Sequence, residues 1–109
     1  MGMITDTMRY HELQGQKRDL SFKIQQITME KSRLVKSGND LMRVGTDYDP
    51  DSPAMKTLQK RQADMRLIEE QLEQQMSEYK IQLQAVDAEL GDCKQRLGEE
   101  IKEEMKYSL

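Results

Sequence analysis

The fold is decided by residues 45–53, which read Gly45-Thr46-Asp47-Tyr48-Asp49-Pro50-Asp51-Ser52-Pro53 and hold both prolines of the chain. Gly45 is expected to end one helix, because glycine readily adopts the left-handed conformation common at that point. The residues before the two prolines avoid helical geometry. Ser52 is expected to cap a second helix, with Pro53 at its first position, where the missing N–H costs nothing. The stretch therefore predicts the single turn of a helical hairpin.

On both sides of this turn the chain is predicted to be helical. Thr5 or Asp6 is expected to cap the first helix, and the run Ser37-Gly38-Asn39-Asp40 leaves open whether that helix kinks or ends early. The expected elements are helix one over about residues 6–44, a turn over 45–52 and helix two over about 53–106. We therefore expect residues 1–109 to form one all-α unit, an antiparallel two-helix coiled-coil hairpin with a longer C-terminal helix.

Apolar residues spaced seven apart run along both predicted helices, which is the pattern of a coiled-coil seam. In an antiparallel hairpin, the numbers of facing residues have a constant sum, and here a sum of 99 pairs every position. The predicted intrachain seam consists of Leu41–Leu58, Leu34–Met65, Ile27–Leu72, Leu20–Tyr79 and Leu13–Val86. The next pair in this register is Asp6–Cys93, so helix two is expected to extend beyond the start of helix one.

The same register leaves two sets of apolar residues with no predicted partner in the chain. One is a row on the back of helix one, and the other is the end of helix two. Burying a side chain the size of leucine is worth about 1.5–3 kcal/mol, and contiguous exposed apolar surface marks an interaction site. The predicted assembly interface consists of Met8, Gly15, Phe22, Met29, Leu97, Ile101, Met105, Tyr107 and Leu109.

Composition and charge are typical of long helices and exclude several classes of partner. Hydrophobic residues make up 36%, aromatic residues 5% and charged residues 34% of the chain, which is lean for a rounded globular core. The net charge is −3, and no cluster of Lys and Arg is accompanied by stacking aromatics, so no nucleic acid is expected. Because no apolar run approaches about 20 residues, no membrane insertion is expected.

Residues that could carry chemistry are few and isolated, so we expect no catalytic, cofactor or metal site and no enzyme. His11 is interpreted as a solvated surface residue, and Cys93 as a small buried hydrophobe of the seam. The acidic run Glu99-Glu100…Glu103-Glu104 is interpreted as a solvated face. The three aspartates of the turn lack the glycine and the distal glutamate of a calcium loop.

The Pro50-Asp51-Ser52-Pro53 turn, between two helices of which the second is longer, resembles the needle subunits of type III secretion systems. Met55, two residues after the second proline, matches an apolar position of that family. The resemblance covers the turn and the architecture, whereas this chain is longer and has stricter heptads. It implies a hairpin that polymerises into a hollow helical tube, with the C-terminal helix lining the channel.

These observations predict a self-assembling structural subunit of a filament, needle or tube, whose partners are copies of itself and other export or assembly proteins. Two alternatives stay open. One is a small coiled-coil adaptor or chaperone of a secretion or assembly system, whose C-terminal end grips a partner helix. The other is a phage or capsid component such as a scaffolding helix, or a solitary dimer that forms a four-helix bundle. The location is not indicated, although the resemblance implies synthesis in the cytoplasm and export without a cleaved signal peptide.

Overall fold

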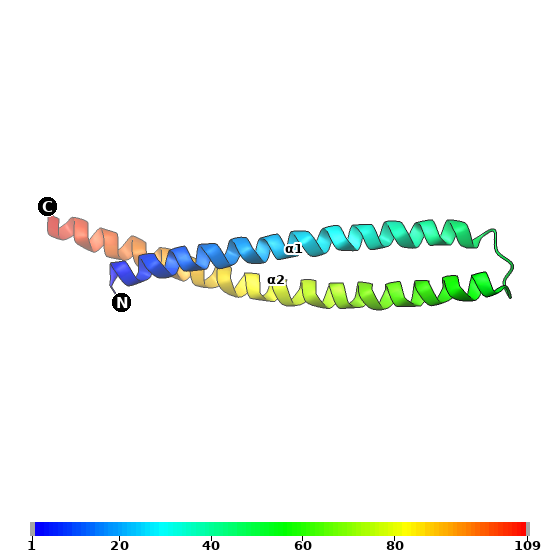
Figure 1. The fold of residues 1–109 in the computed structure, drawn as a ribbon. Coiled ribbons are helices and arrows are strands. Elements are labelled where there is room, and N and C mark those ends of the chain that lie inside the picture. The colour runs from blue at the N-terminus through cyan, green and yellow to red at the C-terminus, as the bar shows by residue number, and fades with distance from the viewer. Residues whose placement is uncertain (1, 109) are drawn as a thin grey trace. The chain divides into compact units, whose positions relative to one another are not determined.

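The computed structural model describes residues 2–108, with the side chains of residues 2–107. It confirms the predicted fold class, an all-α antiparallel two-helix coiled-coil hairpin with a longer C-terminal helix (Figure 1). Helix α1 spans Met3–Gly45 and has 43 residues, and helix α2 spans Pro53–Ser108 and has 56 residues. Residues 2–108 contain no strand.

The hairpin divides into two compact units, which we describe separately. The terminal unit comprises Met1–Lys23 and Tyr79–Leu109, and the turn unit comprises Ile24–Glu78. In each unit a segment of α1 lies antiparallel against a segment of α2 (Figure 1).

The core of the terminal unit is more completely buried than that of the turn unit. Its buried cluster consists of Leu13, Leu20, Val86 and Cys93. A second set of partly buried residues packs against this cluster, and consists of Tyr10, Tyr79, Leu83, Leu90 and Leu97. The thiol of Cys93 donates a hydrogen bond to the backbone carbonyl of Asp6 over 3.1 Å. This contact confirms the predicted register, in which Asp6 faces Cys93.

The turn unit buries a smaller share of its predicted seam residues, three of six, whereas the terminal unit buries three of four. Ile27, Leu58 and Leu72 are buried, whereas Leu34, Leu41 and Met65 are only half-buried. The ten predicted seam positions of the whole chain are therefore all buried or half-buried.

Ion pairs cross between the helices beside the seam. In the terminal unit, Lys17 Nζ lies 2.9 Å from Asp87 Oδ1. In the turn unit, Lys31 Nζ lies 3.6 Å from Glu73 Oε1. The partners are largely solvated, and such pairs contribute about 0–1 kcal/mol each. Their main effect is on specificity, because flanking charges help to select the register and orientation of a coiled coil.

The start of α1 differs from the prediction. The helix begins at Met3, and the N–H of Asp6 donates to the carbonyl of Gly2 over 3.1 Å. Thr5 and Asp6 therefore lie inside the first turn, and their prediction as caps is wrong. An acidic residue in this turn is favourable, because the N-terminal end of a helix carries partial positive charge.

The open question about Ser37-Gly38-Asn39-Asp40 is resolved, because α1 continues through these residues to Gly45. Neighbouring turns on both sides hold Gly38 in the helix, although glycine costs about 1 kcal/mol relative to alanine in a helix interior.

The turn forms much as its residue types predict. The N–H of Ser52 donates to the carbonyl of Asp49 over 3.1 Å, which closes a tight turn with Pro50 at its second position. The Oγ of Ser52 accepts a hydrogen bond from the N–H of Met55 over 3.1 Å. The predicted helix cap is therefore confirmed, and Pro53 is the first residue of α2.

The prediction for Gly45 is wrong in its physical reason. Gly45 does not have a positive φ, so it does not end α1 in the left-handed conformation. It is instead buried, and a Cβ built on it would clash with Cδ2 of Leu58. The N–H groups of Thr46 and Asp47 bond to carbonyls three residues earlier, which ends the helix with a tightened last turn. The absence of a side chain at Gly45 leaves room for the buried side chain of Leu58 on α2.

Two glycine-to-alanine variants test this distinction. A Cβ on Gly38 would meet no described atom within 4 Å, so Gly38→Ala is expected to stabilise the protein by about 0.5–1 kcal/mol. Gly45→Ala gains similar helix propensity but must displace buried Leu58, so its stability should lie about 1–3 kcal/mol below that of Gly38→Ala. Urea unfolding followed by circular dichroism measures both. Equal midpoints would contradict the close approach at Gly45.

Candidate functional site

The most distinctive surface of the terminal unit is the end of α2, which extends past the start of α1 (Figure 1). Among the described side chains, Arg96 is the last residue of α2 that donates a hydrogen bond to α1. Its Nε lies 3.4 Å from Oδ1 of Asp6. Further along, Ile101 is 49% exposed, Met105 61% and Tyr107 91%. We call residues 101–107 the overhang. Leu109, also predicted for this surface, lies outside the described residues.

Leu97 does not belong to this uncovered surface, so the prediction that it has no intrachain partner is wrong. It is half-buried and packs against the buried cluster that contains Cys93. The reason lies at the start of α1. Because the helix begins at Met3, about three residues earlier than predicted, almost one further turn of α1 is available to cover α2.

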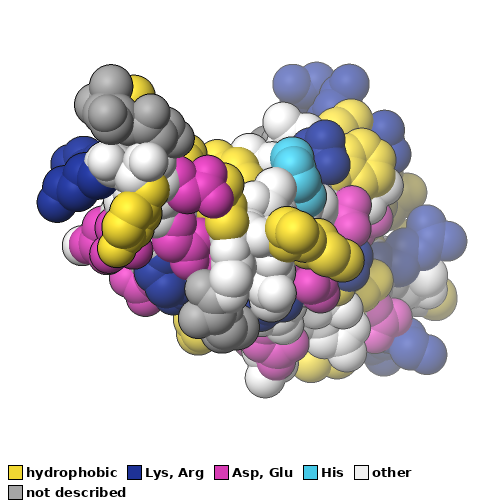
Figure 2. Space-filling view, turned by 90° about the vertical axis from the view of Figure 1, so that its left-hand side faces the viewer, with side chains coloured by type: hydrophobic (Ala, Val, Ile, Leu, Met, Phe, Trp, Pro, Cys, Tyr) yellow, Lys and Arg dark blue, Asp and Glu magenta, His cyan; other side chains and the backbone are white. Residues whose placement is uncertain are grey.

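A second apolar surface is the outer row of α1. In the terminal unit, Met8 is 69% exposed and Phe22 is 59% exposed, and Met29 of the turn unit is also exposed. Gly15, the remaining predicted member, is half-buried, and a Cβ added to it would lie 3.9 Å from the nearest guanidinium nitrogen of Arg18. An end view of the molecule shows hydrophobic side chains reaching the surface among charged ones (Figure 2).

Sequence reasoning missed part of this row. Ile4 is the most exposed of its residues at 78%, and it lies four positions before Met8 on the same helix. The signal was present, because residues four apart share a helix face. It was not used because the helix was predicted to begin only at about residue 6.

The turn unit carries a shallow groove beside its seam. The groove is lined by residues of both helices, including Leu34, Val35, Gly38, Met42 and Met65. Val35 and Met42 are exposed, and the missing side chain of Gly38 leaves space between them. The groove follows from the weak packing already described, in which Leu34 and Met65 are only half-buried.

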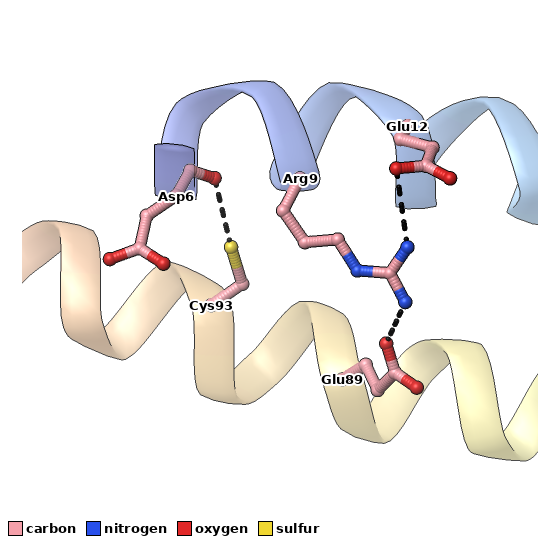
Figure 3. A network of polar contacts seen from close by, with 5 residues as sticks. All are labelled: Asp6, Arg9, Glu12, Glu89 and Cys93. Atoms are coloured by element: carbon pink, nitrogen blue, oxygen red, sulfur yellow. Dashed lines mark hydrogen bonds and ion pairs between the residues drawn. The ribbon is translucent and has the colours of Figure 1, made fainter. Parts of the chain in front are cut away.

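A polar network lies where α1 begins to pack against α2 (Figure 3). Nη2 of Arg9 lies 2.6 Å from Oε2 of Glu89, and Nη1 lies 3.2 Å from Oε2 of Glu12. Hydrogen bonds to Glu89 and then to Glu12 raise the pKa of the Arg9 guanidinium above its ordinary value. One turn earlier, the side chain of Asp6 is only 1% exposed and points toward α2. The sequence did not predict this buried carboxylate.

The remaining chemical candidates stay apart from one another. His11 is exposed, and its ring centroid lies 6.1 Å from that of Tyr10 in an edge arrangement. Cys93 is fully buried. In the part of the chain that the structure describes, no group of three or more His, Cys, Asp and Glu side chains is arranged to hold a metal ion. Over the same residues, neither helix has an apolar stretch long enough to cross a membrane.

Comparison of the chain with known protein families, with curated proteins and with solved structures found no match. The resemblance to needle subunits stays a prediction from the turn Pro50-Asp51-Ser52-Pro53 and the two-helix architecture. The overhang and the outer row of α1 both expose apolar side chains on the terminal unit.

Proposed function

We propose that this protein is a non-enzymatic structural subunit that binds copies of itself through the overhang and the outer row of α1, and so assembles into a helical filament, needle or tube. The observation that carries the proposal is the overhang, where Ile101, Met105 and Tyr107 lie exposed beyond the start of α1. Burial of such side chains is worth about 1.5–3 kcal/mol each, so association that covers them is favourable.

The outer row of α1 supplies a second surface of the same kind. Ile4, Met8 and Phe22 are exposed on the terminal unit, and they lie within one stripe of the helix. Gly15 falls within this stripe, and glycine allows the backbone of another helix to approach closely. A helix docked along this stripe would bury the three apolar side chains together.

A second copy of the chain suits these surfaces because the overhang and the outer row belong to different helices. A contact between two different surfaces is heterologous, and it propagates into a helical assembly when the rotation between copies does not close a ring. Charge supports the same partner. Residues 1–45 carry a net charge of +3 and residues 54–109 a net charge of −3, so the first helix of one copy attracts the second helix of another.

Electron microscopy of the purified protein at rising concentration tests this function. The proposal expects filaments or tubes to appear and lengthen as the concentration rises, with a regular helical repeat. Small particles of one size at every concentration would overturn the helical assembly. They would favour instead an adaptor whose overhang binds an amphipathic helix of another protein, which a stable heteromeric complex in a pull-down would identify.

A further inference from the structure

The carboxylate of Asp6 is buried with one oxygen unpaired. Its side chain is 1% exposed, and Oδ1 lies 3.4 Å from Nε of Arg96, whose own side chain is 44% exposed. Its other oxygen, Oδ2, is buried and has no hydrogen-bond partner among the described residues. A buried polar atom without a partner is costly, so native proteins rarely leave one without a reason.

Glu100 shows the same defect. It lies on α2, one turn after Arg96, and its Oε2 is buried without a hydrogen-bond partner in the described part of the chain. Ionised carboxylates only accept hydrogen bonds, so two of them cannot satisfy each other. A proton on one carboxyl turns it into an O–H donor for the other.

We propose that the carboxyl groups of Asp6 and Glu100 share one proton, and that this proton fastens the first turn of α1 to α2. The two residues come from opposite ends of the terminal unit's sequence, so their hydrogen bond ties the start of α1 to the last covered turn of α2. The inference concerns the terminal unit alone and does not depend on the proposed assembly.

The electrostatics assign the proton to Glu100. The hydrogen bond with Asp6 raises the pKa of Glu100 above its ordinary value of 4.5, and burial raises it further. The hydrogen bond from Glu100 lowers the pKa of Asp6 below its ordinary value of 3.8, burial opposes this, and the charge of Arg96 reinforces it. The positive amino terminus lowers the pKa of both carboxyls. The Cys93 thiol donates to the backbone carbonyl of Asp6 and leaves the carboxylate free for Glu100.

These directions determine how the fastening depends on pH. The pKa of Glu100 is raised, so its contribution is complete below 4.5 and is lost as the pH rises through the raised pKa. The pKa of Asp6 is lowered, so its contribution is present above 3.8 and is lost as the pH falls through the lowered pKa. The hydrogen bond between the two carboxyl groups is therefore most stabilising between pH 3.8 and pH 4.5. At higher pH two negative carboxylates face each other, and the first turn of α1 loosens.

A carbon-13 NMR titration of the glutamate side chains tests the shared proton directly. Glu100 is expected to titrate above the ordinary glutamate pKa of 4.5. In Asp6→Asn the amide can donate a hydrogen bond to ionised Glu100, so the pKa of Glu100 should fall below its value in the native chain. Titration of Glu100 at or below 4.5 in the native chain would overturn the proposal, whether or not the variant folds.

Hydrogen exchange tests the fastening. Protection of the amides of residues 7–10, corrected for intrinsic exchange, is expected to fall as the pH rises above 4.5, by about tenfold for each unit by which the pKa of Glu100 is raised. Glu100→Gln keeps a donor at every pH, so its protection should stay high. Glu103→Gln is the matched control and should behave like the native chain. If both variants lose protection equally as the pH rises, the proposal is wrong.

Discussion

Replacing Leu13 by alanine is expected to lower the free energy of unfolding by about 2–5 kcal/mol. Leu13 is 1% exposed and belongs to the buried cluster of the terminal unit. Its removal leaves a cavity between two helices that have few other buried side chains with which to fill it. Most small domains are stable by only about 5–15 kcal/mol, so this variant should unfold at a much lower urea concentration.

The matched control is Ile81→Ala, in the same unit. Ile81 is 63% exposed, so truncating it removes a similar amount of hydrocarbon from a position that the hairpin does not bury. Its unfolding free energy should stay within about 0.5 kcal/mol of the native value. If the two variants were destabilised equally, the predicted seam would not be the core of the terminal unit.

Replacing both Ile101 and Met105 by serine is expected to weaken self-association at least tenfold while leaving the hairpin folded. A tenfold loss corresponds to about 1.4 kcal/mol, which is less than the burial energy of one large apolar side chain. Both residues lie on the overhang, where they contribute little to the hairpin itself. Sedimentation velocity measures the association, and circular dichroism measures the helix content.

The control for this variant is Lys102→Ser with Glu103→Ser, which changes two exposed residues of the same turn and keeps the net charge. It should associate like the native protein, because it leaves both apolar side chains in place. Equal weakening by the two double variants would show that general disturbance of the helix end, rather than loss of apolar contact, is responsible.

The seam could be predicted because it depends on a repeated pattern. Heptad spacing fixes which side of each helix is apolar, and the turn from Pro50 to Pro53 fixes the offset between the helices. Together they placed Asp6 opposite Cys93, as the 3.1 Å contact between them confirms. The Ser52 cap was predictable for a similar reason, because its hydrogen bond is made within four residues of the chain.

The errors have different physical causes. Gly45 was expected to adopt a left-handed conformation, but its role depends on Leu58, which lies on the other helix. The start of α1 was placed too late because the N–H of Asp6 already donates a helical hydrogen bond to the carbonyl of Gly2, so the helix includes the residues that were expected to cap it. Because α1 was predicted to begin too late, Leu97 was also predicted to have no partner within the chain.

The carboxyl pair was missed, although the heptad row of α2 runs through Cys93 to Glu100. Glu100 was interpreted as part of a solvated acidic face, because charged runs on helices usually are solvated. Asp6 lies in the register of the seam, and Glu100 is the heptad position that follows Cys93 on α2, so heptad spacing places both residues on the seam side of their helices. Their proximity depends on the direction in which each side chain leaves its helix.

Sedimentation of the native protein over a wide range of concentrations tests the central claim most directly. The claim is that the exposed apolar side chains of the overhang and the outer row of α1 are covered by other copies of the chain. The sedimentation coefficient is then expected to rise steadily with concentration, to values beyond those of a dimer. A folded monomer that sediments identically at every concentration would contradict the account.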